Sequence, residues 1–117
     1  MLKKQNRLKK RKSFAYIHRK GKHIGNEVLS LSFVFARMKD SPLKIGFSVS
    51  KKVGNAVIRN RATRKMRHAA KHLIEQNRIK PNHSIIFVAK PNIDKLHLND
   101  IIKAMENALR RGELWNN

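Results

Sequence analysis

The sequence predicts an α+β fold in a single domain of 117 residues. Two segments, 28–36 and 43–50, alternate apolar and polar side chains, which is typical of β-strands with one buried face. Two longer segments, 55–77 and 98–111, repeat apolar side chains with a helical period. A chain of this length can bury one modest core, and a second domain is not expected.

The start of the chain predicts a basic arm followed by a short helix. Residues 1–12 are rich in Lys and Arg and contain no acid. Segment 13–20 is expected to be helical, with Ser13 as its N-cap and Gly21 ending it. Phe14 lies on the apolar face of this helix. The arm and the helix together predict a strongly positive N-terminal region.

Three strands are expected along the rest of the chain. Segment 28–36 reads VLSLSFVFA, and a turn at residues 40–42 separates it from the second strand at 43–50. A loop at 51–55 then leads into the long helix. Segment 84–89 is apolar throughout, so we expect it to be a central strand buried on both faces.

The helix expected at 55–77 separates apolar from basic side chains. On a helical wheel, the apolar residues fall within about a third of the circumference: Ile58, Ala62, Met66, Ala69, Ala70 and Leu73. The opposite side carries Arg61, Arg64, Arg67 and Lys71, with Lys65 at the border. An ordinary solvated helix face mixes acids and bases, yet no acid occurs between Asp40 and Glu75. We therefore interpret the basic side as a surface that binds a phosphate backbone.

The net charge narrows the class of partner. It is +21, from 28 Lys and Arg against 7 Asp and Glu. So many positive side chains repel one another unless a polyanion screens them, so nucleic acid is the expected partner. The chain has no Cys, and its basic start never reaches the apolar run of a signal peptide. We expect a cytoplasmic protein without a membrane partner.

The loop SKKVGN before the long helix favours anion binding. Lys51 and Lys52 supply charge, and Asn55 stands near the helix N-terminus, where free N–H groups and the helix dipole attract anions. The loop does not match the phosphate-cradling GxxxxGK[ST] pattern, and no acidic magnesium ligand is near. A nucleotide hydrolase is therefore not expected.

No catalytic residue and no metal ligand is predicted in the chain. His68 and His72 have the i,i+4 spacing that can chelate zinc, but a third ligand is missing. The few carboxylates are too scattered along the sequence to suggest a two-metal site. A stand-alone protein nuclease would need such acids.

Three stretches resemble the bacterial ribonuclease P protein subunit. SVSKKVGNAVIRNRATRKMRHA is similar to the signature of that family, whose hallmark Arg-Asn-Arg motif stands here as Arg59-Asn60-Arg61. RLKKRKSFAYIHRKG resembles the family's opening, and IIFVAKP resembles its late strand. The resemblance spans nearly the whole chain.

The resemblance implies a fold and a function. The fold would be a two-layer α/β sandwich with a mixed, four-stranded sheet, a left-handed βαβ crossover and a likeness to a ribosomal-protein domain; splitting segment 28–36 could supply the fourth strand. The function would be to help a catalytic RNA remove the 5′ leader of precursor tRNA. The partners would be that RNA subunit and precursor tRNA, with no small-molecule substrate. The RNA would hold the Mg²⁺ that supports the chemistry.

The resemblance also points to two sets of site residues. Those expected to bind the RNA subunit are Lys51, Lys52, Asn55, Arg59, Asn60, Arg61, Arg64, Lys65 and Arg67. Those expected to form a leader-binding cleft are Lys9, Lys10, Phe14 and His18, although Phe14 could equally pack into the core. Four positions depart from the family pattern: Thr63 replaces a lysine, His18 an aromatic residue, Ser32 a tyrosine and Glu27 an arginine. These departures weaken the expected leader contacts and leave the RNA-subunit contacts intact.

Two questions stay open at this level. A structural RNA-binding protein of the ribosomal kind would share the charge and the sheet without affecting cleavage of any substrate, and it is the alternative function. Trp115 could close over the core or stay loose.

Overall fold

A computed structural model describes residues 2–36 and 41–116 and contains a four-stranded mixed sheet with three α-helices in these ranges. The elements are α1 (Arg11–Lys20), β1 (Lys22–Gly25), β2 (Leu29–Phe35), β3 (Lys44–Ser48), α2 (Ala56–Glu75), β4 (His83–Ala89) and α3 (Leu98–Arg111). Two short 3-10 helices, η1 (Lys4–Asn6) and η2 (Ile93–Lys95), precede α1 and α3. The predicted α+β class and mixed four-stranded sheet are confirmed.

The strands lie in the order β1-β2-β4-β3. β4 is interior, as predicted for the apolar segment, and pairs antiparallel with β2 and parallel with β3. Because β3 and β4 are parallel neighbours, α2 is the crossover that joins them. The left-handed sense of this crossover stays a prediction.

The fourth strand corrects one expectation. Segment 28–36 is not split but forms the single strand β2, and the extra strand is β1, whose Lys22 pairs with Phe33 and Gly25 with Ser30. β1 has only four residues, and its Lys22, His23 and Gly25 are exposed. It therefore lacks the apolar alternation that would have marked it as a strand.

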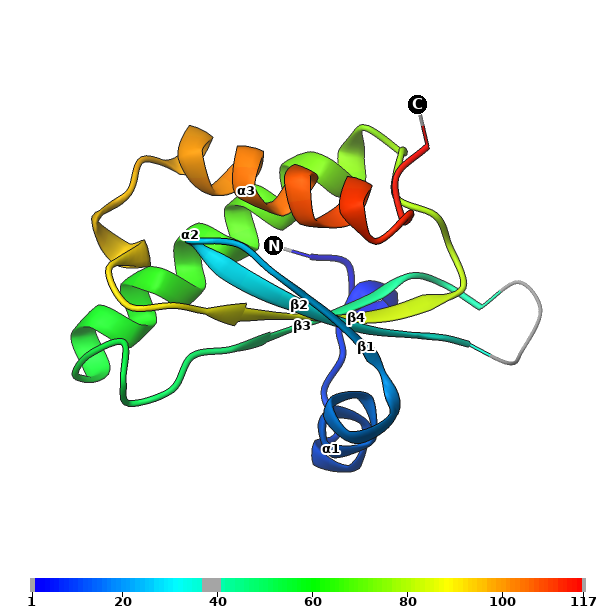
Figure 1. The fold of residues 1–117 in the computed structure, drawn as a ribbon, viewed down its shortest axis with the longest axis horizontal. Coiled ribbons are helices and arrows are strands. Elements are labelled where there is room, and N and C mark those ends of the chain that lie inside the picture. The colour runs from blue at the N-terminus through cyan, green and yellow to red at the C-terminus, as the bar shows by residue number, and fades with distance from the viewer. Residues whose placement is uncertain (1, 37–40, 117) are drawn as a thin grey trace.

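Helices cover the two faces of the sheet unequally (Figure 1). α2 and α3 lie on one face, where Leu31, Ile85 and Phe87 of the sheet join the main core. α1 lies on the opposite face, toward which Ile86 points because side chains alternate along a strand. Ile17 of α1 is buried there. The sandwich thus gains a partial third layer.

The N-terminal arm is paired with the sheet, and α1 begins earlier than predicted. The Leu8 N–H donates to the Ile45 carbonyl of β3 at 3.0 Å, which places the arm along the outer edge of this strand. α1 starts at Arg11 with Lys10 as N-cap, so the arm ends before residue 12. The Ser13 N–H donates to the Lys10 carbonyl at 3.0 Å. Ser13 is therefore already inside the first turn and is not the cap.

The C-terminal end closes over the core. Trp115 is 7% exposed and forms an isolated antiparallel bridge with Ile79. The Arg110 guanidinium carbon lies 5.6 Å from the centre of the indole ring, within the range of a cation–π contact. This answers the question that the sequence left open for Trp115. Of the turn predicted at residues 40–42, Asp40 lies outside the described residues.

Candidate nucleic-acid interface

The candidate site is built on α2 and the loop before it. Asn55 caps the helix, and its side-chain oxygen accepts a hydrogen bond from the Ile58 N–H at 3.0 Å. Gly54 has a φ of +154°, and a Cβ there would lie 2.8 Å from Ile58, so the position requires glycine. Lys51 and Lys52 are exposed in the turn just before. The loop therefore presents two ammonium groups beside the N-terminus of α2.

The outward half of α2 presents cations to solvent. The exposed residues between Asn60 and Lys71 are Asn60, Arg61, Arg64, Arg67, His68 and Lys71. Val57 near the start of α2 and Glu75 at its end are also exposed, and Glu75 lies 3.8 Å from the Lys71 ammonium. The buried residues of α2 are Ala62, Met66, Ala69, Ala70 and Leu73. The predicted division into an apolar and a basic side is confirmed. At a rise of about 1.5 Å per residue, the exposed cations from Arg61 to Lys71 span about 15 Å of α2.

Arg61 faces a buried carboxylate that no sequence pattern indicated. Asp94 of η2 is 6% exposed, and its Oδ2 lies 3.9 Å from Nη1 of Arg61. The Arg61 side chain is 52% exposed, so solvent screens the pair and most of the guanidinium remains accessible. Asp94 comes from a distant part of the chain, so only the fold brings it here.

Lys65 holds η2 against α2. Its ammonium donates to the carbonyls of Asp94 at 2.6 Å and of Leu96 at 2.8 Å. Two of its three N–H groups are thus used inside the protein. The structure therefore gives Lys65 a packing role in addition to the RNA contact predicted from the sequence.

Arg59, Thr63 and Arg67 share the flank of α2 that faces β3, because they are spaced i,i+4. The Thr63 hydroxyl donates to the Arg59 carbonyl at 2.9 Å. The Nε of Arg59 is buried and has no hydrogen-bond partner within the described residues. The rest of the Arg59 side chain is half-buried at the border between the apolar and basic sides of α2.

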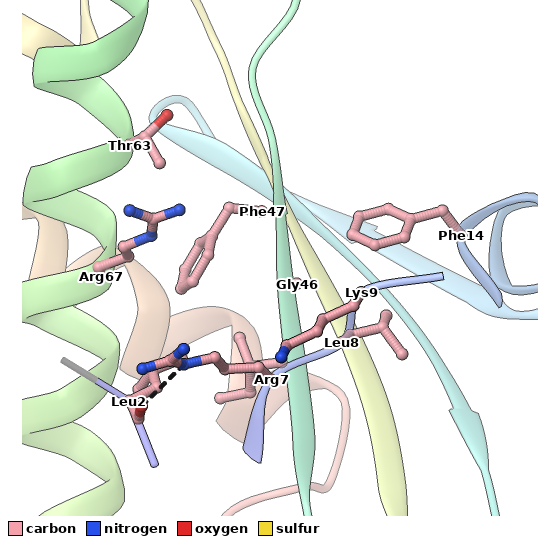
Figure 2. A pocket seen from close by; sticks show the side chains of 10 residues that line it. Leu2, Arg7, Leu8, Lys9, Phe14, Gly46, Phe47, Thr63 and Arg67 are labelled. Carbon is pink, nitrogen blue, oxygen red and sulfur yellow. Dashed lines mark hydrogen bonds between the residues drawn. The ribbon is translucent and has the colours of Figure 1, made fainter. Parts of the chain in front are cut away.

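A pocket of about 320 Å³ opens beside this flank (Figure 2). Thr63 and Arg67 of α2 point toward Phe47 of β3, and Phe14 approaches β3 from the side of α1. Lys9 of the arm lines the same pocket. The pocket thus combines two aromatic rings, one on either side of β3, with the three cations Arg7, Lys9 and Arg67, which suits a base and its phosphate.

The structure brings together half of the predicted leader cleft. Phe14 and Lys9 line the pocket, whereas Lys10 and His18 are exposed and do not. Phe14 is half-buried, and its ring lies so close to Gly46 that a Cβ at that glycine would be 2.5 Å from the ring. Phe14 therefore packs on the sheet and still offers part of its ring to the pocket.

Several pocket residues escaped prediction, among them an aromatic residue and residues of the arm. Phe47, Leu2 and Arg7 also line the cavity, and the Arg7 Nε donates to the Leu2 carbonyl at 2.9 Å (Figure 2). Phe47 was read only as part of a strand, and the other two as part of a basic arm. Pairing of that arm with β3 is a tertiary contact that local sequence does not reveal.

The other departures from the family pattern lie away from this pocket. Ser32 is buried, and its hydroxyl lies 2.8 Å from Nδ1 of His23. Glu27 is exposed in the turn before β2. Neither lines the cavity.

The potential metal ligands of the described residues are spread apart. Within the described part of the chain, no three His, Cys, Asp or Glu side chains come together. The buried acid Asp94 faces Arg61, and His72 contacts Gln76 at 3.0 Å. In the same part of the chain, no helix has both the length and the apolar character needed to cross a bilayer.

The fold and the site define a class of protein: a small, basic α+β domain that offers a polyanion an acid-poor helix face next to an aromatic pocket. The model of the family described as Ribonuclease P matches residues 2–113. The chain belongs to this ribonuclease P protein family.

Individual relatives agree with this assignment. The ribonuclease P protein component of Bacillus velezensis is 36% identical and covers 97% of this chain and 95% of its own. The ribonuclease P protein component of Alkaliphilus metalliredigens is 34% identical, and the match covers 93% of this chain and 95% of that one. A solved structure of the Staphylococcus aureus RNase P protein superimposes with a TM-score of 0.77 at 28% identity, covering 95% of this chain and 98% of that one.

Proposed function

We propose that this chain is the protein subunit of ribonuclease P. In this role it binds the catalytic RNA and the 5′ leader of precursor tRNA and promotes removal of the leader by the RNA in the cytoplasm. The observation that carries the proposal is the basic half of α2, which continues through Arg67 into the pocket near Phe14. One surface can therefore hold two RNA segments at once.

The contact with the RNA subunit is assigned to the loop and the outward half of α2. Guanidinium groups suit it because each can donate two parallel hydrogen bonds to a phosphate. The exposed guanidinium groups of Arg61, Arg64 and Arg67 support this assignment. The residues proposed are Lys51, Lys52, Asn55, Arg59, Asn60, Arg61, Arg64, Lys65 and Arg67.

The leader is assigned to the pocket. Phe14 and Phe47 can stack on unpaired bases, while Lys9 and Arg67 neutralise the phosphates between them. Lys10 and His18 continue this surface along the exposed side of α1. Thr63 offers a hydroxyl where the family usually has a cation, so this chain should hold the leader with fewer phosphate contacts.

The Mg²⁺ required for hydrolysis is proposed to be held by the RNA. The protein contributes charge that lets phosphates approach one another, which lowers the Mg²⁺ concentration that the folded RNA needs. The side chains of this chain bind and orient RNA and take no part in the bond-breaking step.

The test is reconstitution with catalytic RNA and precursor tRNA at low Mg²⁺, with and without the protein. We expect the protein to lower the Mg²⁺ requirement and to favour precursor over mature tRNA. The Arg59→Ala/Arg61→Ala/Arg64→Ala variant tests the assigned interface. It should fold, but it should lose most of the reduction in Mg²⁺ requirement and most of the preference for precursor tRNA. A protein that binds RNA without changing either quantity would instead be a structural RNA-binding protein.

A further inference from the structure

A second aromatic surface lies on the other flank of α1. Tyr16 and Phe35 line the same two adjoining pockets, of about 800 and 430 Å³, together with Val34. Phe35 is 67% exposed, the largest fraction among the large hydrophobic side chains of the described residues, and Tyr16 is 43% exposed. We call these three residues and the cations around them the Tyr16–Phe35 surface.

The fold leaves Phe35 open for a simple reason. β1 begins at Lys22, opposite Phe33, so the last two residues of β2 have no partner on the β1 side. On the other side Phe35 pairs with His83 of β4, whose ring contacts it edge-on with centroids 5.2 Å apart. The phenyl ring is therefore held in place, which reduces the entropy lost when a flat group stacks on it.

The rim of this surface is basic. Lys12 and Arg19 line one pocket, and Lys20 and Lys22 line the other. Residues 1–26 contain no acid, and the acid that the second pocket contains is Glu113. Protein–protein interfaces are depleted in Lys, whereas aromatic platforms edged by cations are the usual site for single-stranded nucleic acid. Charge therefore favours a single strand of RNA over a protein.

Helical geometry relates this surface to the leader pocket. Phe14 and Tyr16 stand two residues apart on α1, which turns their side chains about 200° from each other around the helix. The buried side chain of Ile17 lies between these directions on the side facing the sheet. A strand leaving the pocket at Phe14 therefore has only to cross α1, about 10 Å wide, to reach Tyr16.

We propose that the Tyr16–Phe35 surface binds the distal part of the 5′ leader, beyond the nucleotides held at Phe14. This inference rests on the proposed function. Bases of the distal leader stack on Tyr16 and Phe35, and the four cations hold the phosphates between them. The surface thus makes affinity depend on leader length.

The test compares precursor tRNAs with a short leader, which fills only the pocket at Phe14, and a leader longer by about 8 nucleotides. Binding to the reconstituted holoenzyme is measured for the parent and for Tyr16→Ala/Phe35→Ala. The parent should bind the long-leader precursor more tightly, and the variant should lose about fivefold or more for that substrate alone. Tyr16→Phe and Phe35→Tyr, which keep the rings, should retain the parent's affinity.

The matched control is Leu98→Ala, which removes a similarly exposed apolar side chain from α3 and should change neither affinity. Thermal melts show whether the double variant is folded. If it is not, Lys20→Gln/Lys22→Gln replaces it and should weaken binding of the long leader alone.

The outcomes separate the two proposals. A parent that prefers precursor to mature tRNA but binds both leaders equally would overturn this inference and leave the proposed function standing. A folded Tyr16→Ala/Phe35→Ala protein with the parent's affinities would also overturn this inference. Self-association of the parent through Phe35 would overturn it too, because the surface would then be a dimer contact. A parent with no preference for precursor would overturn both.

Discussion

Arg64 is a direct probe of the interface at the scale of a single residue. It is exposed on the outward half of α2 and has no ion pair among the described residues, in contrast to Arg61. Its guanidinium is therefore available to a phosphate without first breaking an internal contact.

We expect Arg64→Gln to weaken binding to the RNA subunit and to reduce the slope of log K against log salt by about 0.7–0.9, because one phosphate contact is lost. The measurement is a salt titration of affinity. Lys103→Gln, which removes an exposed cation from α3, should leave the slope unchanged. Equal slopes for Arg64→Gln and the parent would remove Arg64 from the interface.

Phe14 tests the leader pocket. Phe14→Ala should weaken the binding of precursor tRNA by about 5- to 100-fold, because stacking on one base is lost. The affinity for mature tRNA, which has no leader, should stay unchanged. Competition binding with the two RNAs measures this. If the affinities for both RNAs fall together and the melting temperature also falls, the main role of the ring is packing in the core, where it contacts Gly46.

The residues that prediction missed are those brought in by distant segments. Arg59 to Arg67 could be placed because a helix fixes their spacing in the sequence itself. Asp94 could not be placed beside Arg61, nor Leu2 and Arg7 in the pocket, because these contacts depend on how η2 and the arm pack. Lys65 was grouped with the RNA contacts by its position, yet its ammonium points to two carbonyls of η2.

At the scale of the element, Lys65 distinguishes packing from RNA binding. Lys65→Met keeps the aliphatic stem but removes both hydrogen bonds, so we expect the free energy of unfolding to fall by about 1–3 kcal/mol. Urea unfolding measures this, with Arg64→Met as the matched change on the same helix. If Lys65→Met instead alters the salt slope as much as Arg64→Met and leaves stability intact, its main role is RNA contact.

The bounds of a helix or strand could be predicted where its apolar residues repeat at a regular interval in the sequence. α3 was placed at its observed ends because its apolar stripe and terminal charges agree. β1 was missed because four largely exposed residues show no alternation. The start of α1 was misplaced because Ser13 looks like a cap, whereas the pairing of Leu8 with β3 lets the helix begin earlier.

At the scale of the whole molecule, charge repulsion should limit the stability of the free protein. With 28 Lys and Arg against 7 Asp and Glu, added salt screens repulsion more than it weakens the few ion pairs. We expect the melting temperature to rise by about 4–8 °C for each kcal/mol of repulsion screened. The fluorescence of Trp115, the only tryptophan, reports the transition. A melting temperature that falls with salt would mean that ion pairs such as Arg110–Glu106 dominate.

The pairing of the arm with β3 has one more consequence. An open outer strand can act as a template on which the strand of another molecule adds, and that is how many sheet proteins polymerise. Here Leu8 and Arg7 already occupy the β3 positions around Ile45. During synthesis these residues leave the ribosome well before β3 does, so the arm is available to pair with β3 as soon as that strand emerges. A protein stored at high concentration without RNA is thereby kept from growing into fibres through this strand.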